Sequence, residues 1–445
     1  MTSPRLPDPA FPAGDRGAAE PVRRNVAHAQ RPRTSVTKRV LLSVAGAVAA
    51  VAVAVGAFAA YSYVDLSNGL HRSNITLPGA GTKKNVAESN ILVMGLDSRL
   101  DENGNALPTD VYNALHAGNQ GDGGYNANVL MLIHIPAGGK KAVGISIPRD
   151  DYAPLSGSPD GVSASKIKEA YGLALDQKLT ELTKAGVAQA DAYQQARTFA
   201  RQTELQTVSD FLGGVRIDHF IEVTMAAFYQ VAQAVQPITV CIAQDTQDPY
   251  SGADFKAGVQ QLTASQAVSF VRQRRDENNT ALNFTDLDRE RRQQAFIVSL
   301  ATKLKKADTF ANPATLESLI AAAKQNIALD SGFDLLSFAS EAQHLAGGNI
   351  TFTTLPITGY GVKDGKDVNL VDPDQIHAVV QQLLNPGTAT ATPTATPGAT
   401  TPSGPSATTA PAPSPSPTAS TPPGPNGTYT DPTAPLPSGG VPCVK

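Results

Sequence analysis

The chain contains an apolar run, Ile91-Leu92-Val93-Met94-Gly95-Leu96, that ends at a carboxylate, Asp97. Two similar runs follow it, from Val129 to Ile135 and from Ala142 to Ile147. All three are apolar throughout rather than at alternate positions, which is typical of strands buried on both faces. Further strands alternate with helical segments later in the chain. The sequence therefore predicts an α/β domain, a three-layer α/β/α sandwich with a mixed central sheet.

Two expectations concern helices in the second half of this domain. The polar stretch from Gln177 to Phe211 is rich in Ala and Gln, which indicates one or two surface helices. Asp286 or Asp288 is expected to cap the helix that runs to about Lys305.

Composition divides the 445-residue chain into four segments. Residues 1–38, rich in Pro and Ala, are predicted to be a disordered cytoplasmic segment. Residues 39–64 are predicted to form a transmembrane helix, and residues 65–385 the folded extracellular domain. Residues 386–445 consist mostly of Pro, Thr, Ser, Ala and Gly, so they are predicted to be a low-complexity, disordered tail.

The membrane prediction rests on a charge-free stretch that continues from Val40 to Val64 and is long enough to cross a bilayer as a helix. Lys38, Arg39 and two earlier arginines precede it, which favours a cytoplasmic N-terminus and an exported domain. A cleaved signal peptide is the alternative, but this run is longer and starts later than such peptides do. We expect a single-pass anchor in the cell membrane.

The chain has two cysteines, Cys241 in an apolar strand and Cys443 near the end of the tail. Outside the cell two cysteines can pair, so a disulfide between them is one expectation. One buried thiol and one free thiol in the tail is the other.

Several polar residues in separate segments are suited to hold phosphate, and a formal net charge of −3 offers no general basic surface to explain them. Guanidinium groups bind phosphate oxygens two at a time, and a carboxylate beside them can hold a hard metal ion. The alternative is a solvated helix face with balanced charges. Strand-end positions favour a pyrophosphate site instead. Its predicted members are Asp97, Arg149, Arg272, Arg274, Arg289 and Gln293. The spacing i, i+3, i+4 places Arg289, Arg292 and Gln293 on one face of a helix.

These segments resemble the LytR-CpsA-Psr proteins, which are membrane-anchored enzymes of Gram-positive and actinobacterial cell envelopes. The landmarks are Gly95 to Arg99, Ser146 to Asp150, Lys166 to Tyr171, Ile217 to Phe220, Val271 to Arg274 and Asp286 to Gln294. The resemblance implies transfer of a glycopolymer from a polyprenyl pyrophosphate carrier to peptidoglycan through a phosphodiester bond. It also implies an apolar tunnel for the polyprenyl chain and Mg²⁺ as cofactor.

Carried over residue by residue, the resemblance implies that Arg149, Arg272, Arg274, Arg289 and Gln293 contact the phosphates. Asp97, Arg149 and Arg289 would be catalytic, and Asp97 would bind the metal. The family usually has an Arg followed by Asp-Thr at the start of the second strand, where this chain has Asn126 and Asn128. An amide oxygen at Asn128 can still bind Mg²⁺ as a second metal ligand, but it brings no charge, so metal affinity should fall. Three possibilities are left open. Either Asp97 and the substrate phosphates are enough to bind the metal, or Asp122 contributes, or turnover is impaired.

Three functions are therefore weighed. The first is a Mg²⁺-assisted phosphotransferase that acts on the polyprenyl-linked glycopolymer and peptidoglycan. The second is a polyprenyl pyrophosphate hydrolase, since water can replace the sugar hydroxyl. The third is a binding module without turnover. No helix-turn-helix or basic domain points to nucleic acid as a partner.

Overall fold

In the computed structural model, the described residues are 57–79, 88–121, 124–138, 141–282, 284–305, 312–338, 348–386 and 424–445. The chain divides into residues 1–60 and a compact unit of residues 61–445. The predicted transmembrane helix lies mostly outside the described residues, which contain a helix over 57–69. None of the helices in the described ranges has both the length and the apolar character needed to span a bilayer.

A mixed sheet of eight strands forms the centre of the compact unit. Its strands in spatial order are β1 (His71–Ser73), β12 (Ile327–Asp330), β7 (His219–Thr224), β2 (Ser89–Leu96), β3 (Ala127–Ile135), β4 (Ala142–Ile147), β13 (Ile350–Thr354) and β17 (Leu436–Pro437). The pair β2–β7 is parallel, whereas β3 runs antiparallel to both β2 and β4. The predicted mixed sheet is confirmed.

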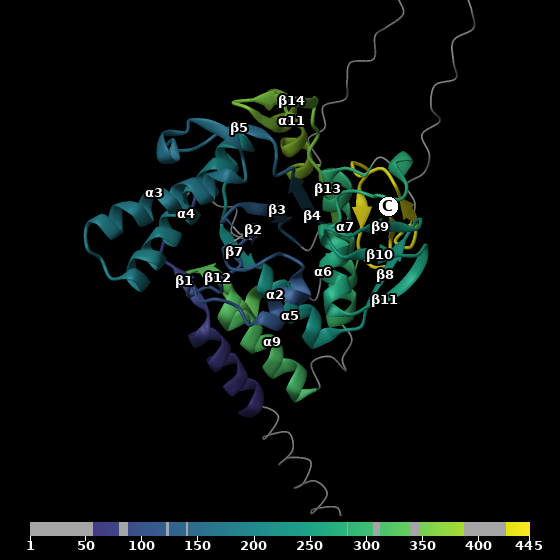
Figure 1. Cartoon of the computed structure of the whole chain (residues 1–445), viewed down its shortest axis with the longest axis horizontal. Coiled ribbons are helices and arrows are strands. Elements are labelled where there is room, and N and C mark those ends of the chain that lie inside the picture. Colours follow the sequence, from purple (N-terminus) through teal and green to yellow (C-terminus); the bar gives the residue numbers. More distant parts are fainter. Residues whose placement is uncertain are drawn as a thin grey trace, which may run out of the picture. The chain divides into compact units, whose positions relative to one another are not determined.

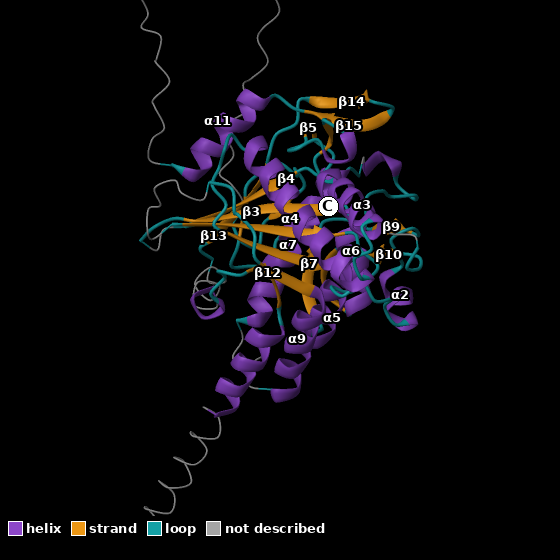
Figure 2. Cartoon of the chain, turned by 90° about the vertical axis from the view of Figure 1, so that its left-hand side faces the viewer, coloured by secondary structure: helices purple, strands orange, loops and turns teal. Residues whose placement is uncertain are grey.

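Helices cover both faces of this sheet (Figures 1 and 2). They are α2 (Thr109–Leu115), α3 (Glu169–Lys184), α4 (Gln189–Phe211), α5 (Met225–Val235), α6 (Ala264–Arg272), α7 (Asp286–Leu304), α9 (Pro313–Asn326) and α11 (Pro373–Leu384). Leu92 and Met94 of β2 face the core formed with α3, α4 and α11. Val93 between them packs on the opposite side, against the core of α5, α6 and α7. This alternation explains why the run is apolar at every position.

The remaining strands form smaller sheets. They are β11 (Gly258–Leu262), β8 (Ile238–Ile242), β18 (Cys443–Val444) and β16 (Thr428–Tyr429) in one sheet, with the pairs β9 (Thr246–Asp248) and β10 (Ala253–Phe255), β14 (Gly359–Lys363) and β15 (Lys366–Leu370), and β5 (Tyr152–Pro154) and β6 (Ala164–Lys166). Two short 3-10 helices span Pro159–Gly161 and Thr280–Leu282.

The prediction for Gln177–Phe211 is wrong in one respect. The stretch does form parts of two helices, but α4 is a core helix whose Arg197, Arg201 and Glu204 are almost fully buried. Arg197 and Arg201 form ion pairs with Glu102 and Glu222, which are also fully buried. A polar sequence is therefore compatible with a buried helix here, because the charges are paired inside the domain.

The predicted tail also requires a correction at its end. Residues 387–423 lie outside the described residues, but 424–445 fold onto the domain through β16, β17 and β18. Tyr429, Leu436 and Val444 are buried in the core beside α6 and α7. Figure 1 shows this segment in yellow next to β8. A mostly Pro- and Ser-rich sequence thus contains enough apolar side chains to dock, but not to form a core of its own.

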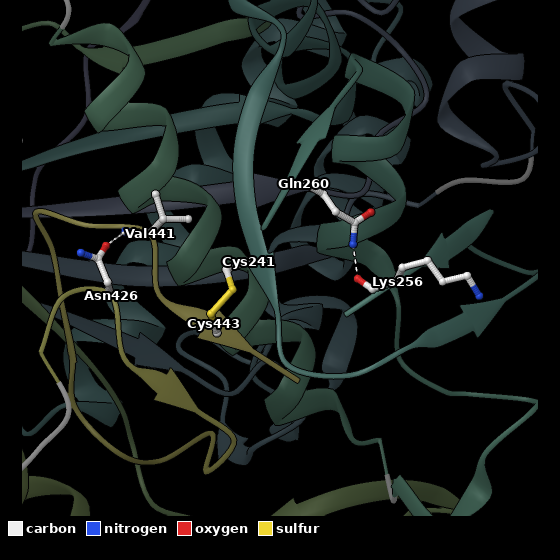
Figure 3. The surroundings of a disulfide bond; sticks show 6 residues. All are labelled: Cys241, Lys256, Gln260, Asn426, Val441 and Cys443. Carbon is white, nitrogen blue, oxygen red and sulfur yellow. Dashed lines mark hydrogen bonds between the residues drawn. A yellow bond between two sulfur atoms is a disulfide. The ribbon is translucent and has the colours of Figure 1, made fainter. Parts of the chain in front are cut away.

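The disulfide is the alternative that the structure confirms for the two cysteines. Cys241 of β8 is bonded to Cys443 of β18, across two parallel strands (Figure 3). The two residues are 202 positions apart in sequence, so the bond closes a long loop. It fastens the C-terminal segment to the domain.

Removing this bond should lower stability. We expect the double variant Cys241→Ser/Cys443→Ser to lose about 2–4 kcal/mol, because the unfolded chain regains the freedom that the loop removes. Urea unfolding of the full chain, followed by circular dichroism, would measure the loss. A reducing agent should destabilise the wild type by a similar amount and leave the double variant unchanged. Equal urea midpoints for wild type and variant under oxidising conditions would contradict the expectation.

Candidate functional site

A cavity of about 420 Å³ lies between the sheet and helices α5, α6 and α7. Along α7 its lining changes character, from Arg289 and Gln293 near the start of the helix to Phe296, Ile297 and Leu300 further along. At 1.5 Å per residue, these positions extend over about 16 Å. The cavity therefore has a charged end and an apolar end.

The same change occurs along β2. Val93 and Gly95 line the cavity within the strand, and Asp97 lines it just past the strand end. A Cβ atom at Gly95 would lie 2.8 Å from the Cβ of Val129, so the glycine allows β2 and β3 to approach here. The other apolar lining residues are Leu96, Val129, Val223, Met225, Phe228, Val268 and Val271.

Helix α7 begins at the charged end, and its cap differs from the prediction. The N-cap is Thr285, whose hydroxyl accepts from the backbone N–H of Asp288, while the Asp288 carboxylate accepts from the backbone N–H of Thr285. This reciprocal capping box satisfies two backbone donors. Asp286 is left for another role in the first turn.

Asp286 binds two of the predicted arginines. Arg149, which follows β4, donates to both Asp286 oxygens, at 3.1 and 3.2 Å. Arg289 donates to the same carboxylate at 3.0 Å. Burial alone would raise the pKa of Asp286, but Arg289 and Arg149 lower it. The carboxylate therefore stays charged and fixes the two guanidinium groups side by side.

Asn128 completes this group from the start of β3. Its side-chain oxygen accepts a hydrogen bond of 2.7 Å from Nη1 of Arg149. The amide that replaces the usual carboxylate thus positions an arginine in this chain. Arg149 and Arg289 are each 5 % exposed, so little water competes for them.

The opposite side of the charged end is built by Arg99, Asp97 and Arg272. Nη1 of Arg99 is 2.5 Å from Oδ1 of Asp97. Arg272, the last residue of α6, donates to the backbone carbonyls of Leu115 and His116. Arg274, just beyond the helix, is exposed. Gln293 donates to the carbonyl of Val271 at 3.3 Å.

Positive charge is in excess at this end of the cavity. Six arginines line it, against Asp97 and Asp248 in the lining and Asp286 behind it. Burial, Arg99 and Arg274 lower the pKa of Arg272. For Arg289, burial and the nearby Arg149 outweigh Asp286 and lower the pKa to about 10. Nε of Arg289 is buried and has no hydrogen-bond partner among the described residues. An anion at this point would supply the missing acceptor and offset the repulsion.

All seven predicted site residues line this one cavity: Asp97, Asn128, Arg149, Arg272, Arg274, Arg289 and Gln293. Sequence reasoning missed Arg99, Arg275 and Asp286, although each is within three residues of a predicted member. It also missed Tyr250 at the rim of the cavity. The guanidinium carbon of Arg275 lies 4.3 Å from the centroid of the Tyr250 ring. Single aromatic residues in loops carry no signal in sequence.

Two further arginines of α7 serve the fold instead. Arg291 donates to the carbonyls of Pro432 and Ala434 in the C-terminal segment. Arg292, grouped with Arg289 on one helix face by sequence spacing, is fully buried and donates to Gln273 and to the carbonyl of Lys445. These contacts brace the helix that presents Arg289.

The donor set for Mg²⁺ is small. Asp97 shares an oxygen with Arg99, and the Asn128 oxygen is bonded to Arg149. No group of three or more His, Cys, Asp or Glu residues is placed to hold a metal in the described part of the chain. Asp122 lies outside the described residues. These residues fit a Mg²⁺ ion that takes most of its ligands from substrate phosphates and water, as Mg²⁺ commonly does, with Asp97 as the carboxylate.

The model of the LytR_cpsA_psr family matches residues 61–385. The chain belongs to this family. It is 36 % identical over 331 residues to the "Cell wall biosynthesis protein LcpA" of Corynebacterium glutamicum, covering 73 % of this chain and 62 % of LcpA. It thus spans about three fifths of the length of that relative.

A more distant relative is the "Polyisoprenyl-teichoic acid--peptidoglycan teichoic acid transferase TagU" of Bacillus cereus, 25 % identical over 67 % of this chain and 82 % of TagU. Among solved structures, the "LytR-Csp2A-Psr enzyme from Actinomyces oris" has a TM-score of 0.44 and 18 % identity, over 71 % of this chain and 96 % of that one.

Proposed function

We propose that this LytR_cpsA_psr family member is a phosphotransferase that attaches a polyprenyl-pyrophosphate-linked glycopolymer to peptidoglycan by a phosphodiester bond. The observation that carries the proposal is the two-ended cavity. Its six arginines suit a pyrophosphate, and its apolar half suits the first part of a polyprenyl chain. The names of two relatives, a cell wall biosynthesis protein and a peptidoglycan teichoic acid transferase, support the same reaction class.

The proposed reaction is an in-line displacement at phosphorus. A sugar hydroxyl of peptidoglycan attacks the phosphorus that carries the glycopolymer and gives up its proton to water. As the new oxygen–phosphorus bond forms, the bond from that phosphorus to the bridging oxygen breaks. Polyprenyl phosphate leaves with the bridging oxygen and its electron pair. Arg149 and Arg289, held by Asp286, stabilise the charge that develops on the phosphoryl oxygens, and Arg272 and Arg274 hold the other phosphate. Asp97 and Gln293 orient these groups.

Mg²⁺ is part of the proposal. Asp97 would hold it, and it would supply further positive charge at the phosphoryl oxygens. Asn128 would add no charge to the metal site, and its side-chain oxygen already accepts a hydrogen bond from Arg149.

The proposed location is the cell membrane, with residues 39–64 as a single-pass anchor, the N-terminus in the cytoplasm and the catalytic domain outside. The Cys241–Cys443 disulfide supports export, because disulfides persist in oxidising compartments.

Restoring the carboxylate tests how far the site is adapted to asparagine. In Asn128→Asp a third acid joins Asp97 and Asp286 at the charged end, so apparent Mg²⁺ affinity should rise about tenfold. The same carboxylate can pair with Arg149, so turnover at saturating Mg²⁺ should change by less than about threefold. The release of polyprenyl phosphate, measured against Mg²⁺ concentration, would show both effects. A large gain in turnover at every Mg²⁺ concentration would instead indicate that Asn128 makes the natural site degenerate.

The full chain, given a polyprenyl pyrophosphate glycolipid with and without peptidoglycan fragments, distinguishes the three functions. A phosphotransferase gives product joined to the acceptor, whereas a hydrolase releases polyprenyl phosphate at a rate that the acceptor does not change. Retention of the lipid without turnover would identify a binding module and overturn the proposal.

A further inference from the structure

We propose that a second cavity, beside the phosphate site, binds the sugar chain of the acceptor. This inference rests on the proposed function and deepens it. The cavity has a volume of about 660 Å³ and lies on α2 and the loop after it. We name it the acceptor cleft; its lining residues are Thr109, Tyr112, Asn113, His116, Gly118, Asn119 and Gln120.

The chemistry of the lining favours an uncharged, hydroxyl-rich ligand. Among these described residues there is no Asp, Glu, Lys or Arg. Amide side chains offer donors and acceptors together, which matches the hydroxyl and acetamido groups of a sugar. Asn113 and Gln120 are exposed, so their amides are accessible to a ligand. Tyr112 adds an aromatic ring to the lining and is held in place because its hydroxyl donates to the carbonyl of Arg99.

The acceptor cleft is joined to the phosphate cavity by the arginines of that cavity. Arg272 donates to the carbonyls of Leu115 and His116, and Nε of Arg99 donates to the carbonyl of Ala117 at 2.9 Å. Two arginines that line the phosphate cavity therefore also hold the backbone of the cleft. The two sites are built as one unit.

A second contact joins their rims. A Cβ atom at Gly252 would lie 3.0 Å from Cδ2 of His116, so the histidine ring packs against this glycine. The residues before it, Tyr250 and Ser251, line the phosphate cavity. A sugar chain in the cleft would thus extend past His116 toward the phosphates and bring a hydroxyl to the phosphorus.

Two sugar chains take part in the proposed reaction, that of the acceptor and that of the donor glycopolymer. The cleft is assigned to the acceptor. The donor is already held by its pyrophosphate and lipid, whereas the acceptor has no such contacts and needs a site of its own.

The test uses the full chain and a tetramer of N-acetylglucosamine as probe, with binding measured by calorimetry. The double variant Asn113→Ala/Gln120→Ala should weaken binding about tenfold or more, the loss expected for two hydrogen bonds to the sugar. The single variant His116→Gly should weaken binding by a similar factor, because it removes the contacts of the imidazole ring with the sugar. Glycine is chosen at position 116 because His116 has a φ of 46°. Gln382→Ala, an exposed change on α11, is the matched control and should bind like wild type. Unchanged affinity in both cleft variants would overturn the assignment.

Repeating the titration with the glycopolymer-bearing donor already bound separates the two sugars. The acceptor assignment requires that the probe still binds; its displacement would give the cleft to the donor glycan and overturn the assignment. In transfer assays the cleft variants should raise KM for the acceptor and leave KM for the donor unchanged. If the chain binds the tetramer through the cleft but shows no turnover, the proposed function is refuted and the sugar-binding site remains.

Discussion

Arg289→Ala is expected to reduce transfer by about a thousandfold, while the chain remains folded. The guanidinium is fully buried at the charged end of the cavity, and its Nε lacks a hydrogen-bond partner among the described residues. Such a group acts chiefly on the charge that develops at phosphorus, where removal of one arginine costs about 10³-fold or more in turnover. The rate of polyprenyl phosphate release at saturating donor and acceptor would measure the loss.

Two companion variants make this result specific. Arg289→Lys keeps the charge but loses the planar pair of donors, so its activity should lie between wild type and Arg289→Ala. Lys303→Ala, near the other end of α7, should have wild-type activity. Thermal unfolding should show that Arg289→Ala is not less stable, because burial already lowers the pKa of this arginine to about 10. Activity of Arg289→Ala within threefold of wild type would exclude Arg289 from the catalytic role.

The predicted site residues were accessible from sequence because short segments carry them. Asp97 and Arg149 directly follow apolar strands, and Arg289 is close to a helix start, so each position follows from local structure. That they meet in one cavity follows from strand ends lying at one edge of the sheet. The resemblance to a known family supplied the individual roles, among them the phosphate contacts of Arg272 and Gln293.

What sequence could not supply depends on long-range pairing. The charges of α4 look like a solvated surface, and only the fold brings Glu102, 95 residues before Arg197, into contact with it. The docking of residues 424–445 likewise depends on strands of two residues each, whose partners lie some 200 positions earlier or in β13. Periodicity within a short window contains no information on such contacts.

The second large effect is expected at the buried ion cluster of Glu102, Arg197, Arg201 and Glu222. Nη2 of Arg201 lies 2.9 Å from Oε2 of Glu102 and 2.7 Å from Oε1 of Glu222, and Nε lies 3.0 Å from the other Glu222 oxygen. Arg201→Met would leave two buried carboxylates with one guanidinium. We expect a loss of about 3–5 kcal/mol in the free energy of unfolding, from the uncompensated charge.

Urea unfolding of the full chain at pH 7 would measure this loss against Lys178→Met. Lys178 forms a 2.8 Å pair with Glu181 on α3, with 28 % and 60 % of the side chains exposed. An exposed pair of this kind contributes about 0–1 kcal/mol, so the control should be close to wild type. Equal losses in the two variants would contradict the prediction.

The cluster also predicts how the difference between wild type and Arg201→Met depends on pH. Burial alone would raise the pKa of Glu222, but Arg201 and Arg197 lower it from 4.5 to about 2. A carboxylate with a lowered pKa in the folded state stabilises the protein above pH 4.5, and this contribution is lost as the pH falls toward 2. The variant lacks much of it, so the stability difference should be largest near pH 7 and narrow between pH 4.5 and 2. Glu102 lies in the loop that leads from Asp97 to α2. The same ion pairs therefore fix the segment that carries one predicted catalytic residue and the acceptor cleft. Arg201→Met should therefore lower transfer even where the chain is still folded.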